Sequence, residues 1–224
     1  MILDDALAAL GTDAAKAADM ARYHKVERAY LGVATPAIDA LVKEWRSTLD
    51  MDARLALAAE LWASDVHEGR IAAAKLLTQA RIRPDDTAAW DLIAAWVPDC
   101  DTLAIADAVA VAGQKRLVAD PTRLTVLSDW VASDHLWSRY AVLAMTLPWA
   151  KISNPKAADL AQRDMIMGWA GQLASDTHKR IQTTLVDWLA SLAKHDPTRA
   201  TTFMAQHGEA MKSYARKSAQ HKLG

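Results

Sequence analysis

Apolar residues recur at every third or fourth position along most of this chain, a spacing that predicts α-helices rather than strands. Ile38, Leu41, Val42 and Trp45 form one such stripe, and residues 55–62 carry another. Glycine and proline divide the chain between these stretches, and alternating β-branched runs closed by Asn-Gly or Asp-Gly turns are missing. We therefore predict an all-α protein of about a dozen helices, each near the roughly 11-residue mean.

A short motif, Ala-Ser-Asp followed by Arg six or seven residues after the Ala, occurs three times. The copies occupy residues 63–70, 132–139 and 174–180. The first two begin 69 residues apart, close to two helical-repeat units of about 35 residues, and the third begins 42 residues later. Ser and Asp are preferred helix N-caps, so each copy is predicted to start the second helix of a pair. Stacked pairs would form an α-solenoid superhelix with a concave face, in one domain over residues 1–224.

The repeated arginines are Arg70, Arg139 and Arg180, and the repeat predicts that they occupy equivalent positions on one concave face. Further basic residues lie nearby in sequence, at Lys75, Lys115, Arg116, Lys179 and Lys194. Such a set can follow a phosphate backbone. In the alternative interpretation, each arginine pairs with the aspartate of its own or the next copy.

Composition narrows the class of protein. A chain of 224 residues with 52% hydrophobic content can bury its own core. The single cysteine, Cys100, rules out an internal disulfide, and scattered histidines predict no metal site. Asp4 and Asp5 stand where a signal peptide needs basic residues, and no apolar run approaches the roughly 20 residues of a membrane span. We expect a cytoplasmic monomer that needs no cofactor and does not enter a membrane.

Charge is distributed unevenly along the chain. Residues 1–112 contain 18 acidic and 11 basic residues, whereas residues 113–224 contain 9 acidic and 15 basic ones. The basic end includes Lys212, Arg216, Lys217 and Lys222. This polarity fits binding of a polyanion. A solvated C-terminal helix would explain the terminal bases equally well.

Two N-terminal segments carry a family resemblance. Residues 20–25 read Met-Ala-Arg-Tyr-His-Lys, and residues 30–36 read Tyr-Leu-Gly-Val-Ala-Thr-Pro. Together they resemble the N-terminal signature of the AlkD-type DNA alkylation repair glycosylases. Further matches follow in order within residues 60–62, 132–137 and 181–197, so the resemblance spans essentially the whole chain. It implies a HEAT-like fold whose concave basic surface holds duplex DNA containing alkylated bases.

The resemblance also implies a reaction. These glycosylases release N3- and N7-alkylated purines, whose positive charge weakens the N-glycosidic bond, so that the base leaves neutral without a general acid. The enzyme must supply a carboxylate that stabilises the oxocarbenium sugar and orients or deprotonates a water. Aromatic faces would favour the cationic purine. The resemblance implies no deep pocket for a flipped base.

The resemblance places the catalytic carboxylate at Asp107. Leu103 stands four residues earlier, where the family has Trp. The family's active-site Arg aligns with Tyr140, and Arg139 comes one position before it. Asp107, Arg139 and Tyr140 are thus the candidate catalytic residues. These departures are typical of a divergent or non-catalytic paralogue as much as of a working enzyme.

The remaining candidates would contact substrate or DNA. Another family Trp aligns with Asp187, next to Trp188, so Trp137 and Trp188 are candidate aromatic walls. Tyr23 and Lys25 are candidate contacts to the lesion or the DNA backbone. In helical repeats such aromatic residues are more often core, and the N-terminal segment can simply cap the array.

Asp107 has a structural alternative of its own. It lies among Ala106, Ala108, Val109 and Ala110, where an unpaired buried charge is costly. It must therefore face solvent or be held for a purpose.

Three functional hypotheses follow. The first is a DNA glycosylase for N3- and N7-alkylated purines. The second is a non-catalytic HEAT-like protein that recognises duplex or branched DNA, and the third, favoured by the near-zero net charge, is a protein-interaction scaffold.

Overall fold

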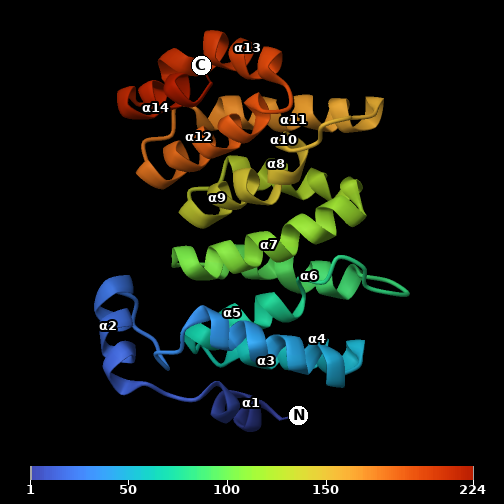
Figure 1. Cartoon of the computed structure of the whole chain (residues 1–224), viewed down its shortest axis with the longest axis vertical. Helices are drawn as coiled ribbons and strands as arrows, with labels where there is room; N and C mark the ends of the chain where they lie inside the picture. Colours follow the sequence, from blue (N-terminus) through green and yellow to red (C-terminus); the bar gives the residue numbers. More distant parts are fainter. Residues whose placement is uncertain (1, 224) are drawn as a thin grey trace. The chain divides into compact units, whose positions relative to one another are not determined.

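The computed structural model describes residues 2–223, which form fourteen α-helices and three short 3-10 helices (Figure 1). Strands are absent from these residues, where the only ladder contact is an isolated parallel bridge between Ala29 and Val66. The all-α prediction is confirmed. The chain divides into two compact units, residues 1–119 and 120–224. The prediction of a single domain over residues 1–224 stays a prediction.

Unit 1 is built around a central helix, α5. Its elements are α1 (Leu3–Leu10), α2 (Ala14–His24), α3 (Thr35–Thr48), α4 (Met51–Ala63), α5 (His67–Leu76), α6 (Thr87–Trp96), η1 (Val97–Asp99) and α7 (Leu103–Ala119). Helix α5 packs against α3, α4 and α7, and α6 packs against α4 and α7. The stripe predicted on α3 is confirmed at Ile38, Val42 and Trp45, which are buried. Unit 1 is therefore a stack of helical pairs.

Unit 2 repeats the helical pair. Its elements are η2 (Pro121–Val126), α8 (Leu127–Val131), α9 (Leu136–Met145), α10 (Leu147–Ala150), α11 (Ala157–Leu173), α12 (Lys179–Ala193), α13 (Pro197–His207), η3 (Gly208–Ala210) and α14 (Ser213–Leu223). The pairs are α8 with α9, α11 with α12, and α13 with α14. Helix α12 packs against α9 and α14, so the second helices of the pairs are neighbours. The predicted HEAT-like arrangement of paired helices is confirmed.

The repeated Ala-Ser-Asp motif does not cap the helices as predicted. The N-caps are Val66 for α5, His135 for α9 and His178 for α12. The motif's polar side chains lie in the turn before each helix, where each accepts the backbone N–H of the residue two positions later. The three bonds run to Ser64 from Val66 (3.4 Å), to Ser133 from His135 (3.1 Å) and to Asp176 from His178 (2.7 Å). The motif thus shapes the turn that leads into the second helix.

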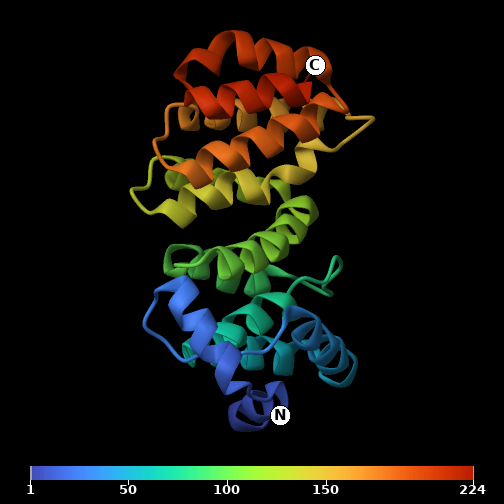
Figure 2. The same cartoon turned by 60° about the vertical axis from the view of Figure 1, so that its left-hand side comes forward.

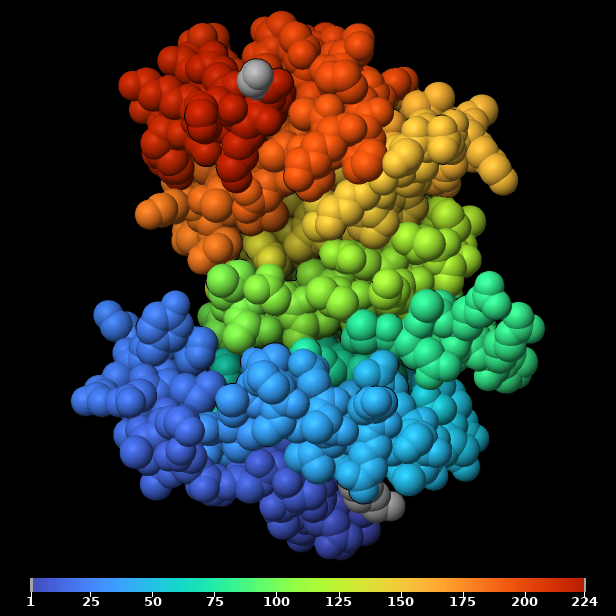
Figure 3. Space-filling model, in the orientation of Figure 1, coloured from blue at the N-terminus to red at the C-terminus, as the bar shows by residue number. Residues whose placement is uncertain are grey.

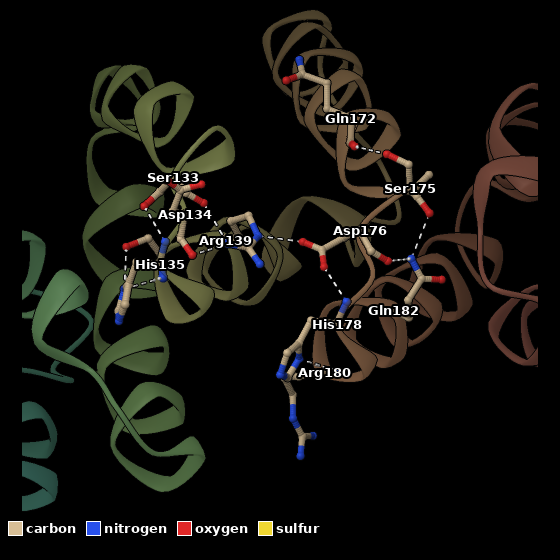
Figure 4. A network of polar contacts seen from close by, with 12 residues as sticks. Ser133, Asp134, His135, Arg139, Gln172, Ser175, Asp176, His178, Arg180 and Gln182 are labelled. Atoms are coloured by element: carbon tan, nitrogen blue, oxygen red, sulfur yellow. Dashed lines mark hydrogen bonds and ion pairs between the residues drawn. The ribbon is translucent and has the colours of Figure 1, made fainter. Parts of the chain in front are cut away.

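The fourth residue of the second helix closes this turn. Arg139 is the fourth residue of α9, and its Nη1 donates to the carbonyl oxygens of Ser133 and Asp134, both at 2.8 Å. In α12 the fourth residue is Gln182, whose amide donates to the carbonyls of Ala174 and Asp176, both at 2.9 Å (Figure 4). Arg180 is only the second residue of α12, so the prediction that it is equivalent to Arg70 and Arg139 is wrong.

The same fourth residues reach the turn of the next helical pair. Arg70 binds its own Asp65 at 3.0 Å and donates to the carbonyl of Asp99, in the connection that leads to α7, at 3.1 Å. Arg139 pairs with Asp176 at 2.7 Å (Figure 4). The Oε1 of Gln182 accepts the backbone N–H of Lys212 at 2.9 Å. We call Arg70, Arg139 and Gln182 the turn-linking residues.

Glu68, the second residue of α5, holds the N-terminal segment in place. Its buried carboxylate accepts three backbone N–H groups, from Leu31 (2.9 Å), Gly32 (2.7 Å) and Val33 (3.1 Å). Gly32 has a φ of 77°, and a Cβ there would collide with Asp13 and Ala17 of the α2 N-terminus. Only glycine fits this close approach.

Helix α2 depends on that anchored segment, because none of its own residues is buried. It lies at the side of unit 1, as Figure 2 shows. Among residues 2–223, no helix is long and apolar enough to cross a membrane.

We predict that Glu68→Gln lowers the free energy of unfolding by about 1–3 kcal/mol, because the neutral amide leaves a buried N–H without its acceptor. Urea denaturation followed by circular dichroism measures this. Glu60→Gln, at an exposed position of α4, is the matched control and should stay within about 0.5 kcal/mol of wild type. Equal stability of the two variants would contradict the anchoring role of Glu68.

Candidate active site

A surface pocket of about 400 Å³ lies between α3, α5 and α7 in unit 1. Its lining residues are Thr35, Asp39 and Arg46 from α3, Ile71 and Lys75 from α5, Thr78 just after α5, and Ala104, Asp107, Ala108 and Val111 from α7. In the space-filling view a recess separates the blue surface of α3 from the green surface of α7 (Figure 3). The pocket gathers carboxylates, bases and apolar side chains in one place.

Asp107 is on the solvent side of α7. It is exposed, while its neighbours Ala106, Ala108 and Val109 are buried. The apolar sequence around Asp107 therefore does not bury the carboxylate, which lies in the wall of the pocket. Leu103, the first residue of α7, is half-buried and one helical turn before Asp107, so the two side chains are neighbours on the helix surface.

Lys75 brings a positive charge into the same pocket. Its Nζ lies 2.6 Å from Oδ1 of Asp39, an ion pair that joins α5 to α3. Arg46 is the other base in the lining. Nothing in the sequence spacing of Lys75 and Asp39, 36 residues apart, reveals this pairing.

The N-terminus of α7 is fixed by a residue that the sequence did not single out. The Arg28 guanidinium, 3% exposed, pairs with Asp101 just before α7 and with Asp65 at 3.2 Å. Arg28 lies between the two signature segments, and its contacts join the segment before α3 to the turns that precede α5 and α7. It thereby fixes the start of the helix that carries Asp107.

Trp137, Arg139 and Tyr140 lie on α9, in unit 2. Trp137 is half-buried, and its ring meets Tyr140 edge-on at 5.7 Å between centroids. Tyr140 itself is buried. Arg139 is committed to Asp176 and to two carbonyls, as described above. Each residue thus has a structural role within α9 and its neighbours.

Trp188 is 1% exposed in the core of unit 2. The helical register turns Trp188 inward and leaves Asp187 outside, where it pairs with Lys222 at 2.7 Å. This burial argues against Trp188 as an aromatic wall, because a buried ring cannot stack on a substrate.

The predicted basic track is only partly available. The Arg70 and Arg139 side chains are 14% and 19% exposed and are bound to carboxylates, the alternative that the sequence left open. Arg116 is buried and binds Asp86 at 2.7 Å together with backbone carbonyls, so it is a core residue. Arg180 differs, since its guanidinium extends away from the turn network (Figure 4).

Tyr23 and Lys25 are both exposed at the end of α2, and 80% of Tyr23 is accessible. Both side chains are therefore open to a ligand. Among the described residues, no group of three or more His, Cys, Asp or Glu side chains is arranged to hold a metal ion.

Comparison with known proteins gives one full-length match. A family model described as DNA alkylation repair enzyme matches residues 3–223. The chain belongs to the DNA alkylation repair enzyme family. No curated protein sequence matches significantly.

Solved structures share the fold of this chain. A predicted DNA alkylation repair enzyme from Enterococcus faecalis superposes with a TM-score of 0.75 at 17% identity, covering 94% of this chain and 96% of that one. AlkD2 from Streptococcus mutans superposes with a TM-score of 0.61 at 14% identity, covering 93% of this chain and 97% of that one. At these identities the likeness shows the fold.

Within this DNA alkylation repair family member, the signature segments surround a buried histidine. The ring of His67 lies 4.4 Å from that of His24 and 5.0 Å from that of Tyr30, and the histidine is fully buried. Burial, with smaller contributions from His24 and Arg28, lowers the pKa of His67 to about 3. His67 therefore stays neutral in the folded protein.

This predicts a loss of stability in acid. In the unfolded chain His67 regains its ordinary pKa of about 6.5, so between pH 6.5 and 3 the unfolded state binds a proton that the folded state does not bind. The free energy of unfolding is therefore at its full value above pH 6.5 and falls as the pH drops toward 3. His67→Phe keeps a ring and removes this titration. Between about pH 6 and 4, wild type should lose about 1.4 kcal/mol per pH unit more than the variant in urea denaturation.

The exposed His221→Asn substitution is the control and should follow wild type. Parallel pH curves for wild type and His67→Phe would contradict the buried neutral state of His67.

Proposed function

We propose that this chain is a DNA glycosylase that releases N3- and N7-alkylated purines from duplex DNA, with Asp107 as its catalytic carboxylate. The observation that carries the proposal is the position of Asp107, exposed in the wall of the pocket between α3, α5 and α7, in a chain matched over residues 3–223 by the DNA alkylation repair family. A buried Asp107 would have excluded the role.

The chemistry requires little beyond electrostatics. When the C1′–N bond breaks, both electrons leave with the cationic purine, which departs neutral, and positive charge develops on the sugar. A carboxylate beside the sugar stabilises that charge. A water then adds to C1′ and gives its proton to Asp107. The products are the free base and an abasic deoxyribose.

DNA binding is assigned to exposed cationic and aromatic side chains rather than to the turn-linking arginines. Lys179 at the start of α12, and Tyr23 and Lys25 at the end of α2, are exposed, and the half-buried Arg180 directs its guanidinium away from the turn network (Figure 4). Roles for Arg139 and Tyr140 in the chemistry stay predictions, as does that of Trp137 as an aromatic wall.

A second function has its own support in the sequence. Leu103 and Tyr140 replace an aromatic and a cationic residue of the family's active site, which is what loss of excision with retained DNA binding would leave. A non-catalytic DNA-binding protein would make the same contacts to the DNA backbone as the glycosylase and would differ only in not releasing the base. A protein-interaction scaffold is the third candidate, and it would show no salt-dependent affinity for duplex DNA.

We predict that Asp107→Asn lowers the rate of N7-methylguanine release by about 10² to 10³, because the amide keeps the shape but loses the charge that stabilises the sugar cation. Affinity for the duplex should stay equal or rise slightly, since the variant repels phosphates less. Release of free base from methylated duplex DNA is followed under single-turnover conditions, and binding is followed by mobility shift.

Asp91→Asn is the matched control. It removes one exposed carboxylate from α6 of the same unit and should leave the rate unchanged. Excision that survives in Asp107→Asn would refute the catalytic assignment, and binding without excision by wild type would favour the non-catalytic candidate.

We also predict that Leu103→Trp accelerates release. An indole one turn before Asp107 would offer a π-face to the positive charge that develops on the sugar as the bond breaks, a contact worth roughly 0.5–2 kcal/mol, or about 2- to 30-fold in rate. Val118→Trp adds the same ring to an exposed position at the far end of α7 and should have no effect. Equal rates for the two variants would show that the missing aromatic ring does not limit the reaction.

A further inference from the structure

Lys75 and Asp39 form an ion pair inside the pocket that contains Asp107. The Lys75 ammonium, on α5, lies 2.6 Å from the Asp39 carboxylate, on α3, and both residues line the pocket with Asp107 of α7. In the fold this pair joins two helices, α3 and α5, that already pack together. The pair therefore invites a functional explanation.

A carboxylate that must approach DNA creates an electrostatic difficulty. Asp107 and Asp39 repel the phosphates of the strand that has to enter the pocket. Only two cationic side chains, Arg46 and Lys75, line the pocket to offset them. Of these, Lys75 is paired with Asp39, which offsets its charge, so a phosphate gains the full attraction of the ammonium only when it replaces Asp39.

We propose that Lys75 binds a phosphate of the lesion-bearing strand beside Asp107, and that Asp39 holds the ammonium in place until the phosphate displaces it. This inference rests on the proposed function, because it assigns Lys75 to the same DNA-binding event. Asp39 then acts as an internal competitor of the DNA backbone.

The exchange of partners is feasible because the pair is only partly buried. The Lys75 and Asp39 side chains are 24% and 55% exposed, and ion pairs of this kind contribute little to stability. The long aliphatic stem of lysine allows the ammonium to turn from Asp39 toward the pocket without movement of α5. A phosphate offers the ammonium a charge-assisted hydrogen bond in place of the one to the carboxylate.

The proposal predicts opposite effects for the two partners. Lys75→Gln removes a phosphate contact, so it should weaken binding to undamaged duplex DNA several-fold. It should also reduce the slope of log affinity against log salt concentration by about 0.9. Asp39→Asn frees the ammonium and should strengthen binding several-fold. A purely structural ion pair predicts the same loss from both variants, because each breaks it.

The changes in DNA affinity caused by Lys75→Gln and Asp39→Asn must exceed those that result from the change in net charge alone. Arg81→Gln and Asp91→Asn make the same charge changes at exposed positions outside the pocket and are the matched controls. Mobility shift over a salt series measures affinity, and thermal melting confirms that all four variants are folded. In excision assays Lys75→Gln should raise KM and leave kcat within about 2-fold of wild type, because the contact is made equally in ground and transition states.

Each outcome separates this inference from the proposed function. If wild type binds and excises but Lys75→Gln matches Arg81→Gln in affinity and salt slope, Lys75 is not a phosphate contact, and the glycosylase proposal stands. Weakened binding in both Lys75→Gln and Asp39→Asn would overturn the competition in favour of a structural pair. Absence of any DNA binding by wild type would refute the proposed function and this inference together.

Discussion

Bonds made by the fourth residue of α5, α9 and α12 hold successive helical pairs together within each unit. Arg70, Arg139 and Gln182 each bind the turn that precedes their own helix and the turn of the next pair. Apolar burial is non-directional, so it specifies the register between pairs less sharply than a directed bond does. Between pairs, Arg70 donates to the carbonyl of Asp99, Arg139 pairs with the carboxylate of Asp176, and Gln182 accepts the backbone N–H of Lys212. The surfaces on which Asp107 and Arg180 lie are thereby set by residues that never need to touch a substrate.

This constraint explains which parts of the repeat could be inferred from sequence. The shared Ala-Ser-Asp motif led to the turns, and the alternative that the arginines pair with aspartates of their own or the next copy describes Arg70 and Arg139. Arg180 misled because it is the second residue of α12, two positions and about half a turn before the equivalent fourth position. Gln182 takes that position with neutral hydrogen bonds, so no charge pattern could identify it.

Of the candidate site, only the part on α7 could be predicted from the sequence. The apolar residues that flank Asp107 left two possibilities, a buried carboxylate or one that faces solvent, and in α7 the carboxylate is exposed. Contacts between helices were beyond sequence reasoning, because the partners are far apart in the chain: Lys75 and Asp39, Arg28 and Asp101, Glu68 and residues 31–33. Tryptophan was a poor guide, since the buried Trp188 and the half-buried Trp137 have the same sequence character.

The two units differ in charge, and the proposed glycosylase reaction would use that difference. Residues 1–119 contain 18 acidic and 13 basic residues, and they carry Asp107, whereas residues 120–224 contain 9 acidic and 13 basic residues. A catalytic carboxylate stabilises a sugar cation through its negative charge, yet the same charge opposes the approach of DNA. A chain that concentrates DNA affinity in its basic half can keep a carboxylate for catalysis in the other half. On this view the acidity of unit 1 is what catalysis demands, and the Lys75–Asp39 pair is the point where unit 1 still admits a phosphate.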